Sequence, residues 1–131
     1  MYFGIVFSNF GSTKSSDAIG FRFNSYNATG LSSLYSSANT GYTCSVNAIK
    51  HIAYVYTASE CKRYVNGELA DTTSVSFPSA AKTTNSIGGW MNADGWHPDA
   101  RIYRIGISGH AMTAAEVAQR YAFFAERFGI E

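Results

Sequence analysis

The sequence that decides the fold is HIAYVYTASECKRYVNGELADT, residues 51–72. It opens on a run rich in β-branched and aromatic side chains, and a second run after a short connection alternates polar with apolar residues. Asn66-Gly67 follows directly, and this dipeptide tolerates the positive φ angles of a type I′ turn. We therefore predict consecutive hairpins, whose strands are 51–57, 61–65 and 68–72.

A further strand, RIYRIGIS over residues 101–108, lies towards the carboxyl end. Its isoleucines, Ile102, Ile105 and Ile107, do not follow one strict period of two. Either Gly106 allows a bulge or both faces of the strand are covered. The sequence leaves the two explanations open.

The helix that follows has a marked start and stop. Thr113 and Glu116 have the spacing of a capping box, and Gly129 supplies a stop signal. We predict a helix over 113–128. Its apolar face comprises Val117, Tyr121, Phe124 and Phe128. The aromatic residues exceed what one face can bury, so Phe123 can fall outside that face. Core packing is the favoured interpretation, and Phe123 is a candidate contact to a neighbouring subunit if it is exposed.

The remaining segments are less regular. Apolar or alternating runs predict strands over 2–7 and 19–23, and a further strand starts at Ser86–Trp90. The stretch 24–47 is dominated by Ser, Asn, Thr, Gly and Tyr, and we expect short strands between turns there. Without repeats or linker-like segments, the whole chain is expected to be one domain.

Length and charge limit the classes of protein to consider. A chain of 131 residues is too short for two separate cores. Ten basic and nine acidic residues give a net charge of +1, which argues against nucleic acid or anionic membrane as partners. Residues 1–7 lack the features of a signal peptide, and nothing later reaches membrane-spanning length.

The order of these signals resembles the laminin-G-like domains of the concanavalin A-like lectin and glucanase superfamily. The similarity covers about residues 42–121 and rests on HIAYVY, CKRYVNG, SIGGW and RIYRIGIS running into AMTAAEV. It implies an all-β fold: a two-sheet antiparallel β-sandwich, or jelly roll, with one C-terminal α-helix, made by a single domain over 1–131. Ligands of such folds bind at rim loops or on a concave sheet face.

This chain departs from the family pattern at several positions. The family usually has acidic residues in the penultimate strand, where this chain has Tyr103 and Arg104, and a Trp before the histidine-led strand, where it has Ile49-Lys50. Calcium or glycan functions tied to those positions are therefore not carried over.

Met1 leads directly into an expected interior strand, so the opening strand of the family pattern is expected to be absent at the amino end. We therefore expect an open sheet edge, where Tyr2 and Phe3 are candidate interface residues. An apolar edge of this kind favours protein subunits of a larger assembly as partners. The chain is then expected to be an oligomer or part of a larger protein.

The loop WMNADGWHPD, residues 90–99, is the candidate ligand-binding site. Tryptophan rings stack on sugar faces, and neighbouring polar groups can bond to hydroxyls. The candidate residues are Trp90, Asn92, Asp94, Trp96, His97 and Asp99. In the alternative interpretation the tryptophans fill the core and the polar residues simply make the turn. A calcium site at Asp94 and Asp99 would lack a full set of oxygen ligands, so no cofactor is expected.

The sequence contains no recognisable catalytic constellation. The related glucanases carry alternating carboxylates on one strand, but no two of the nine acids here are two residues apart. His51, His97 and His110 are too scattered for a zinc site, and His51 is expected at a strand end without a role in proton transfer. We predict that the protein is not an enzyme. Cys44 and Cys61 are expected to be free thiols rather than a disulfide.

Two functional hypotheses follow. The first is a lectin-like, non-catalytic module that recognises glycan or a protein surface. The second is a structural virion protein, such as a capsid decoration, cement or tail component, which uses the jelly roll for subunit contacts. Either one places the protein at an extracellular surface or in a virion.

Overall fold

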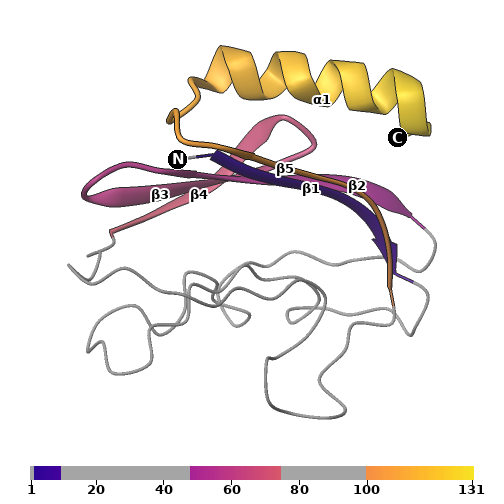
Figure 1. The fold of residues 1–131 in the computed structure, drawn as a ribbon, viewed down its shortest axis with the longest axis horizontal. Helices are drawn as coiled ribbons and strands as arrows, with labels where there is room; N and C mark the ends of the chain where they lie inside the picture. The colour runs from indigo at the N-terminus through magenta and orange to yellow at the C-terminus, as the bar shows by residue number, and fades with distance from the viewer. Residues whose placement is uncertain (1, 10–47, 75–99) are drawn as a thin grey trace, which may run out of the picture.

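The computed structural model of the chain describes residues 2–9, 48–74 and 100–131. These residues form a five-stranded antiparallel sheet in the order β4-β3-β2-β1-β5, with a helix across one face (Figure 1). The elements are β1 (Tyr2–Asn9), β2 (Ile49–Tyr56), β3 (Glu60–Val65), β4 (Glu68–Ser74), β5 (Ala100–Ser108) and α1 (Ala114–Phe128). The strands predicted for these parts of the chain are confirmed, with small shifts at their ends.

β1 lies inside the sheet, contrary to the open edge predicted at the amino end. It pairs with β2 on one side and with β5 on the other, so that Tyr2 lies opposite both Val55 and Ser108. Tyr2 and Phe3 are accordingly buried, with 1% and 5% of their surfaces exposed. The prediction that these two residues form an exposed interface is wrong, because β5 returns from the far end of the sequence to cover that edge.

The β3–β4 hairpin closes as predicted. Asn66 and Gly67 have φ angles of 49° and 82°, as both central positions of a type I′ turn require. Asn66 also joins the hairpin to β2, because its N–H donates to the His51 carbonyl at 2.8 Å and its Oδ1 accepts from the His51 N–H at 3.0 Å. The turn residue therefore fixes the backbone of His51.

Replacing Gly67 with alanine should destabilise the fold. The new Cβ would stand 2.8 Å from Cδ1 of Tyr121 on α1, at a φ angle that side chains rarely adopt. We expect a loss of about 1–3 kcal/mol in the free energy of unfolding, measured by urea denaturation. Gly109→Ala is the matched control, since nothing lies within 4 Å of its Cβ position. Equal stability of the two variants would contradict this account of the turn.

The uneven isoleucine spacing of β5 is explained by a bulge. The register against β1 shifts after Val6, which leaves Tyr103 as the extra residue. Tyr103 and Arg104 therefore both face α1, where they contact its aromatic rings. Gly106 pairs regularly with β1, so the bulge is at Tyr103 and not at Gly106. The isoleucines then share the opposite face: Ile102, Ile105 and Ile107.

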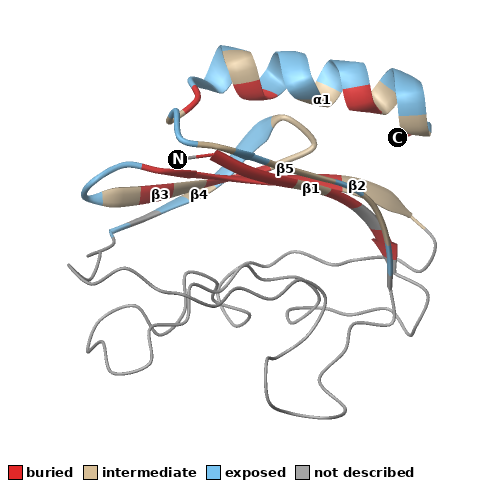
Figure 2. Cartoon of the chain, viewed as in Figure 1, coloured by how far each residue is buried: buried red, intermediate tan, exposed pale blue. Residues whose placement is uncertain are grey.

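α1 begins and ends as predicted. Thr113 and Glu116 form the capping box, and Gly129 adopts the left-handed conformation that stops the helix. Figure 2 shows the buried residues of α1 on the side turned to the sheet. They join two core clusters, one of Tyr2, Ala53, Val55, Tyr64, Met112 and Val117, the other of Val6, Phe124 and Ile130. Across the described ranges, no helix has the length and apolarity needed to span a membrane.

The capping box supports a second stability prediction. Thr113→Ala removes the oxygen that accepts from the Glu116 N–H and the hydroxyl that donates to its carboxylate. We expect a loss of about 1 kcal/mol in unfolding free energy. Thr113→Ser retains the hydroxyl and should stay close to the wild type. Chemical denaturation, monitored by the circular dichroism signal of the helix, measures both variants. An equal loss of stability in the two variants would refute the prediction.

The face of the sheet turned away from α1 is buried at its centre, over β1, β2 and β3. Register places on it a set of buried side chains, namely Phe3, Ile52, Tyr54, Tyr56 and Cys61. Cys61 is a free thiol, as predicted. A sandwich packs a second sheet against such a face. The second sheet stays a prediction, because the segments expected to supply its strands lie outside the described residues. These segments are 19–23, 24–47 and 86–90. Cys44 also lies outside the described residues.

Candidate functional site

The loop predicted to bind ligand lies outside the described residues. Its candidates therefore remain predictions: Trp90, Asn92, Asp94, Trp96, His97 and Asp99. The same holds for a calcium site at two of these acids. Of the predicted interface residues, Phe123 is 60% exposed on α1. Its exposure outside the apolar stripe agrees with the alternative interpretation and not with the favoured one of core packing.

A buried polar pair lies between α1 and the sheet. His51 has 0% of its surface exposed, and its Nε2 lies 3.2 Å from the Tyr2 hydroxyl. Its ring stacks on Tyr121 at 6.3 Å and meets the edge of Phe124 at 5.3 Å between centroids. Its Nδ1 has no hydrogen-bond partner in the described part of the chain. His51 lies inside β2, so the expectation that it flanks its strand is wrong.

Burial controls the protonation of this pair. Desolvation first, and then repulsion from Arg120, lowers the pKa of His51 from 6.5 to about 4. Desolvation also raises the pKa of Tyr2, although Arg120 and Arg104 oppose that shift. Both groups are therefore neutral near neutral pH. His51 is also shielded from solvent by the surrounding rings, which fits a packing role.

Two arginines stand beside this pair at the solvent side of the seam between α1 and β5. The guanidinium carbon of Arg120 lies 5.3 Å from the Tyr2 ring centroid, and that of Arg104 lies 5.7 Å from the Phe124 ring centroid. Both side chains are exposed. None of the ion pairs found within the described ranges includes either one.

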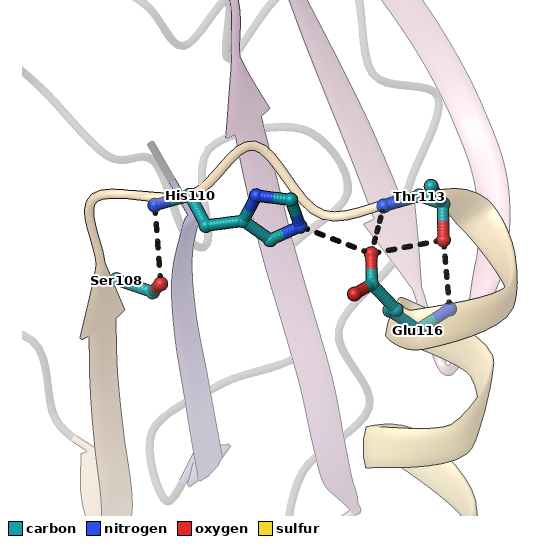
Figure 3. Close-up of polar contacts among 4 residues, drawn as sticks. All are labelled: Ser108, His110, Thr113 and Glu116. Atoms are coloured by element: carbon teal, nitrogen blue, oxygen red, sulfur yellow. Dashed lines mark hydrogen bonds and ion pairs between the residues drawn. The ribbon is translucent and has the colours of Figure 1, made fainter.

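The start of α1 brings together a serine, a histidine and a glutamate (Figure 3). Oε2 of Glu116 accepts from the Thr113 N–H at 2.7 Å and lies 3.3 Å from Nε2 of His110. The Ser108 hydroxyl, however, accepts from the backbone N–H of His110 and does not meet its ring. A nucleophile and its base must be hydrogen-bonded to each other. The group is therefore a helix cap and not a catalytic triad.

A second polar cluster lies on the face away from α1. Arg63 of β3 is buried and pairs with Asp71 of β4 at 2.8 Å. Beside it, the rings of Tyr54 and Tyr56 stack at 6.4 Å. Burial raises the pKa of the Cys61 thiol to about 11, so the thiolate that a nucleophile needs is suppressed. Apart from the half-buried Asp71, this cluster is buried and packs the sheet.

The comparisons with known proteins agree with this architecture. A family model described as the concanavalin A-like lectin/glucanases superfamily matches residues 3–118. The chain belongs to this superfamily. Comparisons with curated proteins and with solved structures gave no significant match. The resemblance noted in the sequence is thus confirmed at the level of the superfamily, which includes both lectins and glucanases.

The superfamily includes glucanases, and a glycosidase needs two carboxyl groups close to each other. β4 contains a bulge at Ala70. Glu68 therefore pairs with Val65, and Asp71 pairs with Arg63. The two carboxylates share a face although they are three residues apart. A search for acidic residues two positions apart in the sequence does not find such a pair. Asp71 is held by Arg63, and Glu68 is exposed next to the turn. Within the described ranges, no group of three His, Cys, Asp or Glu residues is arranged to hold a metal ion.

Sequence reasoning missed the seam between α1 and β5. In the sequence, Arg104 stands out only as a departure from the family pattern, and no pattern distinguishes Arg120. One signal was available: Arg120 stands one turn before Phe124, at the rim of the apolar helix face. Without the β1–β5 pairing, however, nothing in the sequence connects Tyr2 with that turn of the helix.

Proposed function

We propose that this domain is a non-catalytic binding or assembly module that recognises a glycan or a protein surface. The observation that supports it best is a set of large apolar side chains left outside the core. Leu69, Ile107 and Phe123 are 54%, 67% and 60% exposed, on β4, β5 and α1 respectively. β4 and β5 lie at opposite ends of the sheet order, so each of the three residues is a separate candidate contact point and not part of one patch.

The engagement of three of the six described acidic side chains supports a role without catalysis. Glu60 pairs with Lys62 at 2.9 Å, Asp71 pairs with Arg63, and Glu116 is bound in the helix cap. A glycosidase needs one carboxyl as an acid and a second as a nucleophile or base. Carboxylates already committed to neighbouring cations and N–H groups are poorly placed for those roles.

The second candidate is a structural component of a larger assembly, such as a virion decoration, cement or tail protein. Phe123 favours it, because an exposed phenylalanine on an outer helix surface would be covered by a neighbouring subunit. An extracellular surface or a virion is the place where either candidate would act.

Binding and assembly can be separated by experiment. We expect the chain to bind at least one member of a glycan array or to form ordered oligomers in multi-angle light scattering. A monomer that binds a sugar supports the first candidate. Oligomers that dissociate when Phe123 is replaced by serine support the second. A monomer that retains no glycan and captures no shell or surface protein contradicts both.

A further inference from the structure

We propose that Arg104 and Arg120 bind carboxylates carried by an extended segment of a partner protein, which lies along the outer edge of β5. The inference goes beyond the proposed function, because it assigns a surface and a partner chemistry. It rests on the positions of the two guanidinium groups, the strand beside them and the alternation of side chains along that strand.

Both guanidinium groups are held in place by ring contacts, and neither has an ion-pair partner among residues 2–9, 48–74 and 100–131. Each lies over an aromatic ring, Arg120 on Tyr2 and Arg104 on Phe124. A guanidinium stacked on a ring face still directs its N–H donors sideways, where they can hold a carboxylate. Glu116, one turn before Arg120, would be its usual intrahelical partner, but that carboxylate is bound in the cap by Thr113.

The neighbouring strand offers an edge. Among the described strands, β5 is at the end of the sheet order and pairs with β1 alone. Backbone groups along such an edge can pair with an added strand. Gly106 leaves room on the α1 side, since a Cβ there would meet only the Tyr2 ring, at 3.8 Å. Side chains of an added strand would therefore find space next to the two arginines.

The two faces of β5 then specify the added segment. Arg104 faces α1, whereas Ile107 stands on the other face and is largely exposed. A strand alternates its side chains between faces. The matching segment alternates acidic residues, which reach Arg104 and Arg120, with apolar residues, which cover Ile107.

The same geometry favours a peptide over a sugar at this place. Sugars bind by stacking on open aromatic faces. The guanidinium groups of Arg120 and Arg104 already lie over the Tyr2 and Phe124 rings. A polyuronate carries the same carboxylate groups but cannot pair as a strand or make the apolar contacts. It is therefore the alternative ligand in the test.

The test uses the full chain and a short capped peptide of alternating glutamate and valine. We expect binding that weakens as salt is raised and amide shifts in NMR spectra concentrated on residues 105–108. Arg104→Gln and Arg120→Gln should each lower the affinity about tenfold. Both side chains are exposed, so thermal melting should show that these variants stay folded. Ile107→Thr should also weaken binding.

The control for charge is Lys62→Gln, which removes one cation from β3, away from β5 in the sheet order. It should leave the affinity nearly unchanged. Equal binding of a glutamine-for-glutamate peptide, equal loss in the Lys62 variant, or no loss in the arginine variants would overturn the proposal. Arginine-dependent binding of polygalacturonate without binding of the peptide would also overturn it. None of these results affects glycan or subunit recognition elsewhere on the domain.

Discussion

The free energy of unfolding should fall by about 3 kcal/mol as the pH is lowered from 6.5 to about 4. The cause is His51, which is buried neutral between β2 and α1. Its pKa is 6.5 when unfolded and about 4 when folded, so the unfolded chain binds the proton more readily in this window. The stabilisation is fully present above pH 6.5 and is lost as the pH approaches 4.

Charged neighbours strengthen this expectation. Arg120 is the charged group that acts on His51, and Tyr2, Tyr121 and Phe124 surround its ring without offering a negative charge. Glu116 contributes to the pH dependence of stability in a different pH range. Hydrogen bonds from Thr113 lower its pKa below the usual 4.5, so its stabilisation is present above that pH and is lost only at stronger acidity.

Urea denaturation as a function of pH measures the effect of His51. A His51→Gln variant should show no comparable decline across the window. Because that variant could fail to fold, the ring proton shifts of His51 in the wild type give a second measurement. A titration midpoint near 6.5 in the folded protein would contradict the buried, neutral histidine.

Truncating Phe124 should cost far more than truncating its neighbour Phe123. Phe124 is buried in the core cluster with Val6 and Ile130, and its ring also meets His51. We expect Phe124→Ala to lower the free energy of unfolding by about 3–5 kcal/mol through lost burial and a residual cavity. Phe123 is 60% exposed, and its replacement by alanine should change stability by less than about 0.5 kcal/mol.

The two phenylalanine variants form a matched pair on consecutive positions. Chemical denaturation compares their stabilities, and light scattering compares their oligomeric states. If α1 packs as described, only Phe124→Ala unfolds more easily. If the domain also assembles through Phe123 as proposed, only Phe123→Ala weakens the subunit contacts. Similar losses of stability at both positions would show that the helix face is misassigned.

Local signals predicted the hairpin and the helix because each is specified by residues close in sequence. Asn66-Gly67 encodes its own turn, and Thr113 with Glu116 encodes its own cap. Long-range pairing was not predictable in this way. That β5 would cover the edge of β1, and so bury Tyr2, depends on residues about a hundred positions apart.

Bulges account for two features that the sequence left unresolved, because they break the period on which strand prediction relies. The bulge at Tyr103 turned both that residue and Arg104 towards α1, and the bulge at Ala70 brought Glu68 and Asp71 onto one face. The seam that carries Arg104 and Arg120 depends on the first of them. Only pairing registers reveal such positions, since a single sequence does not show which residue is the extra one.

The claim that this superfamily member binds without catalysis is tested most directly by a reducing-end assay on soluble β-glucans. The account predicts no release of reducing ends above the buffer blank. It also predicts no difference between the wild type and Glu68→Gln, whose exposed side chain can be replaced without disturbing the core. Release that grows in proportion to protein concentration and is abolished by Glu68→Gln or Asp71→Asn would contradict the account and identify a working acid pair on β4.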